Sequence, residues 1–203
     1  MNKDCELLAL SKVCQDCRKC PIGGLSYNQK QGDVVVQSFA ANVFSNMNWN
    51  AKIMVVGQNP GWDEMRLKEP FVGASGKVFE KEIWDVVGID RSMLYISNVV
   101  RCYTPQNRKP TDLELENCRF ILDREIEILQ PRIIIALGAM AFAQLTGMNQ
   151  IMRHQGEVIF SPRYRLPIMV VLHPSPFNMN NPERKQSFLS ALKNLKNWMA
   201  TNG

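Results

Sequence analysis

Polar side chains that could bind and orient a small molecule lie in or directly after three apolar runs of the chain. They are Gln58 and Asn59 after the first run, Asn98 within the second, and His173 and Ser175 after the last. A binding pocket needs several convergent polar groups on a rigid scaffold. Taken singly, Asn59 fits an ordinary turn residue and His173 an ordinary core residue. Asn98 is harder to explain in this way, because asparagine is depleted in strands and a buried amide requires partners. Together the five residues indicate a site.

Six cysteines form a second group with chemical potential: Cys5, Cys14, Cys17, Cys20, Cys102 and Cys118. The spacing has a Cys-x-x-Cys pair near the N-terminus and a second pair separated by fifteen residues. In a reducing compartment such spacings indicate metal ligation rather than disulfides. Cys5 has no partner in this scheme, and we expect an ordinary thiol there.

The segments between these groups alternate between predicted strands and helices. Buried strands are predicted at 53–56, 94–100, 132–138 and 166–176, with a short strand near 34–37. Helices are predicted at 6–13, 75–87, 111–130, 139–145 and 182–200. Thr111 and Glu114 form a capping box at the start of the clearest helix. The pattern predicts a three-layer α/β/α fold with a mostly parallel four-stranded sheet and its site at the carboxyl ends of the strands.

Composition and charge set limits on the class of protein. The chain has 203 residues, 45% of them apolar, which suits one domain over 1–203. Its net charge of +5 is compatible with a polyanionic partner. The chain has no run of 18 apolar residues, and its first residues lack the apolar core of a signal peptide. We therefore expect a cytoplasmic protein, and no feature of the sequence indicates an oligomer.

Six motifs in order resemble those of the uracil-DNA glycosylases, over most of the chain from Cys14 to about Pro182. They are VVGQNPG, PFVGASG, YISNVVRC, PQNRKP, IIIALG and HPSP. The series is similar to the family 4, iron–sulfur branch. The resemblance implies a monofunctional, monomeric enzyme that hydrolyses the N-glycosidic bond of uracil in DNA, for base excision repair associated with the nucleoid. Apart from Lys109 in PQNRKP, no lysine lies in these motifs to act as an amine nucleophile, so strand cleavage is not expected.

The resemblance also implies roles for individual residues. Asn59 would position the attacking water, and His173 would donate a hydrogen bond to a carbonyl oxygen of the departing base. Phe71 would stack on the flipped base and Asn98 would bind its hydrogen-bonding edge. Core packing is the alternative for Phe71. Asparagine cannot take a proton as a carboxylate does, so we expect Asn59 to position rather than to act as a strong base.

Further residues complete the implied site. Gly57, Gln58 and Ser175 would bind substrate, and Phe177 would be the apolar wedge that fills the gap in the base stack. Core packing is again the alternative for Phe177. The loop residues Arg101, Arg108 and Lys109 could contact phosphates, or could form a solvated loop.

The resemblance further implies a [4Fe–4S] cluster held by four thiolates. CRKCPI favours Cys17 and Cys20, together with Cys102 and Cys118. CQDCR makes Cys14 an alternative ligand, and a structural zinc ion is the chemical alternative to the cluster. We expect a structural role, in which the cluster pins the N-terminal segment to the segment before the 111–130 helix.

The GQNPG loop departs from the family 4 pattern at Gln58 and Asn59, where that branch usually has Glu and a small residue. The loop is closer to those of the mismatch-specific and single-strand-selective branches. Uracil is the first substrate to expect, with 5-substituted uracils such as hydroxymethyluracil as the alternative. A weakly active uracil-DNA-binding relative and a redox-sensing iron–sulfur protein are the rival hypotheses. Neither rival requires a complete base pocket.

Overall fold

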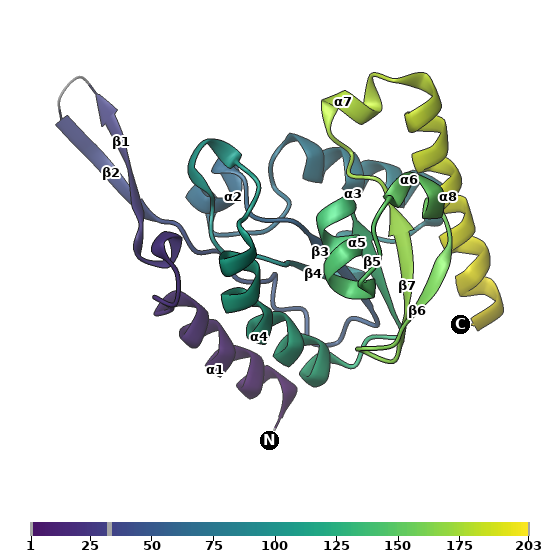
Figure 1. Cartoon of the computed structure of the whole chain (residues 1–203), viewed down its shortest axis with the longest axis horizontal. Coiled ribbons are helices and arrows are strands. Elements are labelled where there is room, and N and C mark those ends of the chain that lie inside the picture. Colours follow the sequence, from purple (N-terminus) through teal and green to yellow (C-terminus); the bar gives the residue numbers. More distant parts are fainter. Residues whose placement is uncertain (1, 32–33, 203) are drawn as a thin grey trace.

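The computed structural model describes residues 2–31 and 34–202 (Figure 1). Its centre is a sheet in the order β4-β3-β5-β7-β6. The strands are β3 (Ile53–Gly57), β4 (Leu94–Asn98), β5 (Ile133–Leu137), β6 (Val158–Ser161) and β7 (Leu166–Val171). Neighbouring strands are parallel except at the edge, where β6 runs antiparallel to β7. The predicted class and the mostly parallel sheet are confirmed. The sheet has five strands and not the predicted four, since β6 was missed. This strand is short and partly exposed, so it gives no buried run in the sequence.

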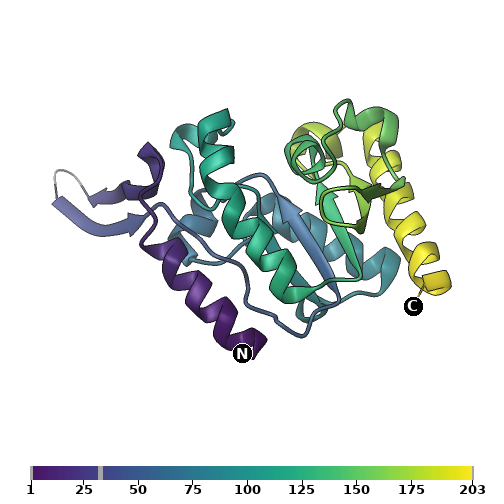
Figure 2. The ribbon, with the colours of Figure 1, turned by 60° about the horizontal axis from the view of Figure 1, so that its bottom comes forward.

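Helices cover both faces of this sheet and form the outer two layers (Figures 1 and 2). One face carries α1 (Lys3–Gln15), α4 (Asp112–Leu129) and α5 (Ala139–Thr146). The other carries α3 (Ala74–Val87) and α8 (Pro182–Asn202). Strands β3, β4 and β5 are buried at every position, as expected for parallel strands enclosed on both sides.

The long helix α4 begins where the sequence predicts. Thr111 Oγ1 accepts a hydrogen bond from the Glu114 main-chain N–H at 3.3 Å, and Glu114 Oε2 accepts from Thr111 N–H at 2.8 Å. This capping box satisfies two N–H groups at the helix start. Helix α4 ends at Leu129, where Gln130 takes a left-handed conformation before Pro131.

A two-stranded hairpin projects from the body of the protein (Figure 1). It consists of β1 (Ser26–Gln31) and β2 (Val34–Ala40), whereas the sequence predicted only a short strand near 34–37. The first strand was missed because its residues, SYNQKQ, are mostly polar and exposed. The remaining short elements are η1 (Pro21–Gly24), α2 (Trp62–Leu67), η2 (Arg91–Met93), η3 (Pro105–Asn107), α6 (Ile151–His154) and α7 (Pro176–Met179). No helix of the described residues is long and apolar enough to span a membrane.

Candidate functional site

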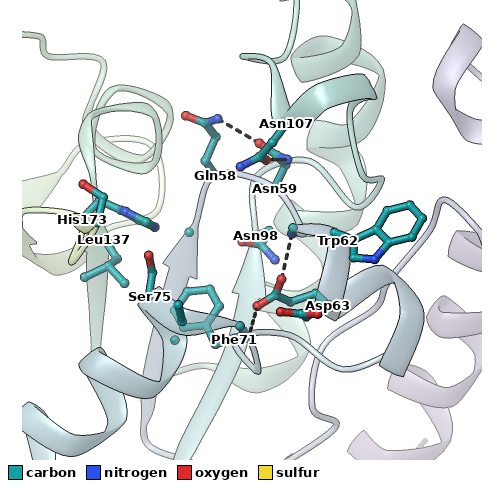
Figure 3. Close-up of a pocket in the computed structure, with 17 residues that line it drawn as sticks. Gln58, Asn59, Trp62, Asp63, Phe71, Ser75, Asn98, Asn107, Leu137 and His173 are labelled. Carbon is teal, nitrogen blue, oxygen red and sulfur yellow. Dashed lines mark hydrogen bonds between the residues drawn. The ribbon is translucent and has the colours of Figure 1, made fainter. Parts of the chain in front are cut away.

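The carboxyl ends of the parallel strands surround a cavity of about 460 Å³ (Figure 3). Gly57 at the end of β3 is paired in register with Asn98 at the end of β4, and His173 follows β7. Seven residues selected from the sequence line this cavity: Gly57, Gln58, Asn59, Phe71, Asn98, His173 and Ser175. The fold therefore brings segments from four parts of the chain into one pocket.

Phe71 forms one wall of the cavity, and its ring lies against β3. A Cβ atom added to Gly57 would lie 2.8 Å from the Phe71 ring and 2.6 Å from Asn98 Oδ1, so glycine is required for this approach. Phe71 has a φ of 59°, which is rare for an aromatic residue. Its ring packs edge-on against Phe79 with centroids 6.1 Å apart. The result is a half-buried ring, fixed in place, on which a planar ligand can stack.

Asn98 provides a polar edge deep in the same cavity. The residue is 3% exposed, and no hydrogen bond joins its side chain to another of the residues drawn around the cavity (Figure 3). Its main-chain carbonyl accepts a hydrogen bond from Arg101 Nη1, which fixes the end of β4. Since a buried amide is costly without partners, the side chain is suited to a ligand that carries both donors and acceptors.

Asn59 is held by a hydrogen-bond network at the cavity mouth. Its Nδ2 donates to the Pro60 carbonyl at 2.9 Å and to Asn107 Oδ1 at 3.2 Å. A main-chain carbonyl can only accept, so this contact fixes which end of the amide is nitrogen. Asn59 Oδ1 accepts from Gln58 Nε2 at 2.9 Å and retains a second lone pair. Asn107 has a φ of 54°, a strained conformation of the kind that clusters at functional sites.

The buried carboxylate of Glu64 ties two loops of the site together. Its Oε2 accepts from Gly61 N–H at 3.0 Å, and its Oε1 accepts from Gly73 N–H at 2.7 Å. The GQNPG loop is therefore fastened to the loop that carries Phe71. We did not select Glu64 from the sequence, although a glutamate three residues after a helix N-cap is a recognisable signal.

His173 points its ring into the cavity (Figure 3). Burial lowers the pKa of His173, and the nearby Glu64 carboxylate partly opposes this effect. The main-chain carbonyl of His173 accepts from Ser175 N–H at 2.8 Å and from Asn178 Nδ2 at 2.7 Å, which holds the HPSP turn. Gly138, with a φ of 95°, allows close approach, because a Cβ atom there would lie 3.1 Å from His173 Cβ. The site thus presents a neutral imidazole that can donate one hydrogen bond.

Phe177 lies outside the cavity at the start of α7. Its side chain is 73% exposed, and the Arg184 guanidinium lies 4.2 Å from its ring centroid. Core packing is therefore the wrong interpretation of this residue. An exposed aromatic side chain beside a pocket is compatible with a wedge.

Five cysteines line a second, much smaller pocket between the N-terminal segment and α4: Cys14, Cys17, Cys20, Cys102 and Cys118. Cys5 is exposed elsewhere on α1, as expected. Cys118 Sγ accepts a hydrogen bond from Arg101 N–H at 3.2 Å. Burial raises the pKa of Cys20, while the N–H groups of Gly23 and Ile22 oppose that rise. Within residues 2–31 and 34–202, no three His, Cys, Asp or Glu side chains are grouped to hold a single metal ion.

Comparison with known families decides the identity of this fold. A family model of the uracil DNA glycosylase superfamily matches residues 44–196. The chain belongs to the uracil-DNA glycosylase superfamily. The family predicted from the ordered motifs is thus confirmed.

Several relatives of this superfamily member carry the name type-4 uracil-DNA glycosylase. The protein from Sulfurisphaera tokodaii is 44% identical over 156 residues, which cover 75% of this chain and 59% of the relative. The protein from Archaeoglobus fulgidus is 33% identical over 155 residues, covering 73% of this chain and 77% of the relative. A third, from Saccharolobus solfataricus, is 32% identical over 178 residues, which cover 83% of this chain and 76% of the relative. The chain thus spans somewhat more than half of the first relative and about three quarters of the other two.

One expectation about charge is wrong for this superfamily member. Arg101 was one of three loop residues that could contact phosphates or form a solvated loop, but its side chain is 2% exposed and forms a buried ion pair with Glu125. Arg108 is partly exposed and pairs with Glu114 at 2.6 Å. Lys109 is exposed, and its contact with phosphates stays a prediction. Burial of Arg101 could not be inferred, because its partner lies 24 residues away on another element.

Several residues of the cavity itself have no role predicted from the sequence. Ser75, Asn107 and Trp62 line it but received no role. Ser75 and Asn107 belong to the motifs PFVGASG and PQNRKP, so their motifs were noticed before their positions were known. Only the folded chain places them beside Asn59 and Phe71.

Proposed function

We propose that this protein is a monofunctional DNA glycosylase that hydrolyses the N-glycosidic bond of uracil in DNA and leaves an abasic site. The observation that carries the proposal is the single cavity in which an aromatic wall, a buried amide, a neutral imidazole and an oriented asparagine converge. The names of the relatives support uracil-containing DNA as the substrate. No lysine is among the described residues that line the cavity, which supports hydrolysis without strand cleavage.

Recognition requires the target base to leave the duplex or to be unpaired already. The Phe71 ring would stack on one face of the pyrimidine, and the Asn98 amide would pair with its carbonyl and N–H groups. The contact of both side chains with Gly57 sets the width of this slot. Phe177 would fill the space that the base vacates, since it is exposed and close to the HPSP turn.

Bond cleavage places negative charge on the departing base and positive charge on the sugar. A donor already aimed at the base oxygen stabilises this charge as it forms. We assign this task to the neutral His173 imidazole, because its pKa is lowered and its ring faces the cavity. Ser175 lies in the same turn and would bind the substrate beside it.

Water capture of the sugar is assigned to Asn59. Pro60 and Asn107 engage its N–H groups, so its oxygen is the atom left to orient a water molecule. Gln58 donates to the same oxygen and limits where the water can lie. The attacking water forms the new bond at the sugar carbon and releases its proton to solvent, while the departing base is protonated in turn.

The five-cysteine pocket supports a metal centre held by thiolates. The family resemblance favours a [4Fe–4S] cluster, which four cysteine thiolates hold. A structural zinc ion with four thiolate ligands is the chemical alternative. We propose Cys17, Cys20, Cys102 and Cys118 as ligands, with Cys14 as the alternative to Cys20. When bound, the cluster would cross-link the N-terminal segment to α4.

Four further expectations are also retained as proposals. The chain would work as a single domain over 1–203 and as a monomer. It would act in the cytoplasm on nucleoid DNA. Its substrate would be uracil first, with 5-substituted uracils as the alternative.

The test is incubation of the purified protein with labelled oligonucleotides, followed by alkali to reveal abasic sites. Separate strands carry uracil, hydroxymethyluracil, thymine opposite guanine, or no lesion. We expect cleavage at uracil. Cleavage at hydroxymethyluracil as well would extend the substrate range, whereas tight binding without any cleavage would replace the enzyme by a uracil-DNA-binding protein.

A further inference from the structure

Trp62 is the exposed member of an aromatic cluster at the mouth of the base cavity. We propose that its indole is a stacking platform for an unpaired base next to the target nucleotide, so that the protein favours single-stranded or locally opened DNA. This inference rests on the proposed function, because it assumes that DNA crosses the cavity mouth.

The position of Trp62 places it on the path of such a strand. It is the first residue of α2, directly after the GQNPG loop, and it lines the cavity. Its side chain is 42% exposed. Figure 3 shows the indole on the far side of Asp63 from Phe71, so it lies at the rim and not in the slot for the target base.

The indole is held by three aromatic neighbours. Its ring centroid lies 6.4 Å from Tyr27, 6.4 Å from Phe39 and 6.0 Å from Tyr103, all in edge-to-face arrangements. Phe39 and Tyr103 are buried, and Trp62 forms the outer part of the cluster. An exposed ring that is already ordered loses little entropy when a base stacks on it.

A second exposed aromatic, Phe177, lies on α7 directly after Ser175, which lines the cavity. Phe177 is 73% exposed at the start of α7, and Figure 1 shows α7 and α2 at the same edge of the molecule, on either side of the strand ends. Cations accompany the two rings, with the exposed Lys109 in the PQNRKP loop and the half-buried Arg184 against Phe177. Aromatic platforms among positive charges are typical of single-strand binding surfaces.

Strand type decides whether this platform can be used. In an intact duplex the neighbouring base is paired and stacked, so its face is not available to an indole. In a single strand the face is free, and stacking on one aromatic side chain changes affinity by roughly 5- to 150-fold. The platform therefore contributes to binding of single strands and not of duplexes.

Tryptophan fluorescence tests the contact without any turnover. The probe is an oligothymidylate of about twelve nucleotides, a length within the range of single-strand sites, and the same strand in a duplex. We expect the single strand to quench the wild-type protein more than the duplex does. Trp62→Phe should remove most of that quenching, whereas Trp84→Phe, which alters an exposed tryptophan on α3 away from the cavity, should retain it.

Affinity provides the second measurement. Trp62→Ala should bind the single strand about tenfold more weakly and the duplex unchanged, while Trp62→Phe keeps most of the affinity. Thermal melting of Trp62→Ala checks that the aromatic cluster still folds. Unchanged quenching in Trp62→Phe, or equal weakening for both kinds of DNA, would overturn the platform. Uracil excision by a protein that shows no Trp62 quenching would contradict the stacking platform and leave the proposed function intact. Quenching without excision would support the contact of Trp62 with single strands and contradict the proposed function.

Discussion

Asn59 donates a side-chain hydrogen bond to Oδ1 of Asn107 at 3.2 Å, across 48 residues of sequence. The contact joins the GQNPG loop to the PQNRKP loop at the mouth of the base cavity. Together with the Pro60 carbonyl it engages the Asn59 amide nitrogen, while the Asn59 oxygen accepts from Gln58. Asn107 is thus a positioning residue for Asn59, in addition to any contact of its own with water.

Replacement of either asparagine should reduce turnover more than binding. Asn59→Ala removes the oxygen that orients the water, and we expect excision about 100-fold slower with the affinity for uracil-containing DNA nearly unchanged. Asn107→Ala should have a smaller effect in the same direction. Single-turnover rates and gel-shift affinities measure the two quantities separately.

The double variant checks that the two residues act together. Asn59→Ala combined with Asn107→Ala should be no slower than Asn59→Ala alone, since coupled residues are not additive. Equal loss of binding and turnover in Asn59→Ala would contradict the water-positioning role.

Gly57→Ala should close the slot for the base. The added methyl group would lie 2.6 Å from Asn98 Oδ1 and 2.8 Å from the Phe71 ring, so one of them must move. We expect a stability loss of about 1–3 kcal/mol and a large rise in KM for uracil-containing DNA. Gly24→Ala is the matched control, because its nearest neighbour is the flexible Arg18 side chain at 3.2 Å. A wild-type KM in Gly57→Ala would show that the slot is wider than the structure indicates.

His173 should make the protein less stable in mild acid. Its pKa is lowered from 6.5 by burial, so the unfolded chain binds a proton at this residue before the folded protein does. The free energy of unfolding should therefore fall as the pH drops below about 6.5, by at most about 1.4 kcal/mol per pH unit from this group. Urea denaturation of wild type and His173→Gln between about pH 7 and pH 5 measures the difference.

The same histidine variant should also excise uracil about 100-fold more slowly, as expected for loss of a donor to developing charge. His154→Gln is the matched control, since His154 is half-buried, contacts Glu157 at 2.8 Å and does not line the cavity. A parallel pH dependence in wild type and His173→Gln would assign the acid sensitivity to other groups.

Cysteine substitutions should separate cluster ligands from ordinary thiols. Cys102→Ser should lose the brown colour and most of the bound iron, and should melt at a lower temperature. Cys5→Ser should retain all three properties, because Cys5 is exposed and outside the cysteine pocket. Iron content, visible absorbance and thermal melting are the measurements.

The choice between Cys14 and Cys20 is settled by the same measurements. Cys20→Ser should lose iron if the proposed ligand set holds, whereas Cys14→Ser should keep it. Iron retained in Cys20→Ser and lost in Cys14→Ser would exchange the two residues. Zinc in place of iron in the wild-type protein would refute the cluster.

The sequence determined the family, the parallel α/β architecture and seven of the residues that line the cavity. Buried parallel strands appear as continuous apolar runs, and polar residues at their carboxyl ends must gather at one edge of the sheet. This local pattern is sufficient to select Asn98 and His173. The capping box at Thr111 is likewise a short-range signal that the structure confirms.

Only the tertiary structure decided the contacts made between distant segments. The edge strand β6 and the polar strand β1 lack a distinctive pattern of apolar residues, because most of their positions are exposed and a polar, exposed segment can form a strand or a loop. The burial of Arg101 against Glu125, the Glu64 link between two loops and the partnership of Asn59 with Asn107 depend on which elements pack together. Side-chain hydrogen bonds across many residues leave no periodic trace in a sequence, so these relationships emerge only when the chain is folded.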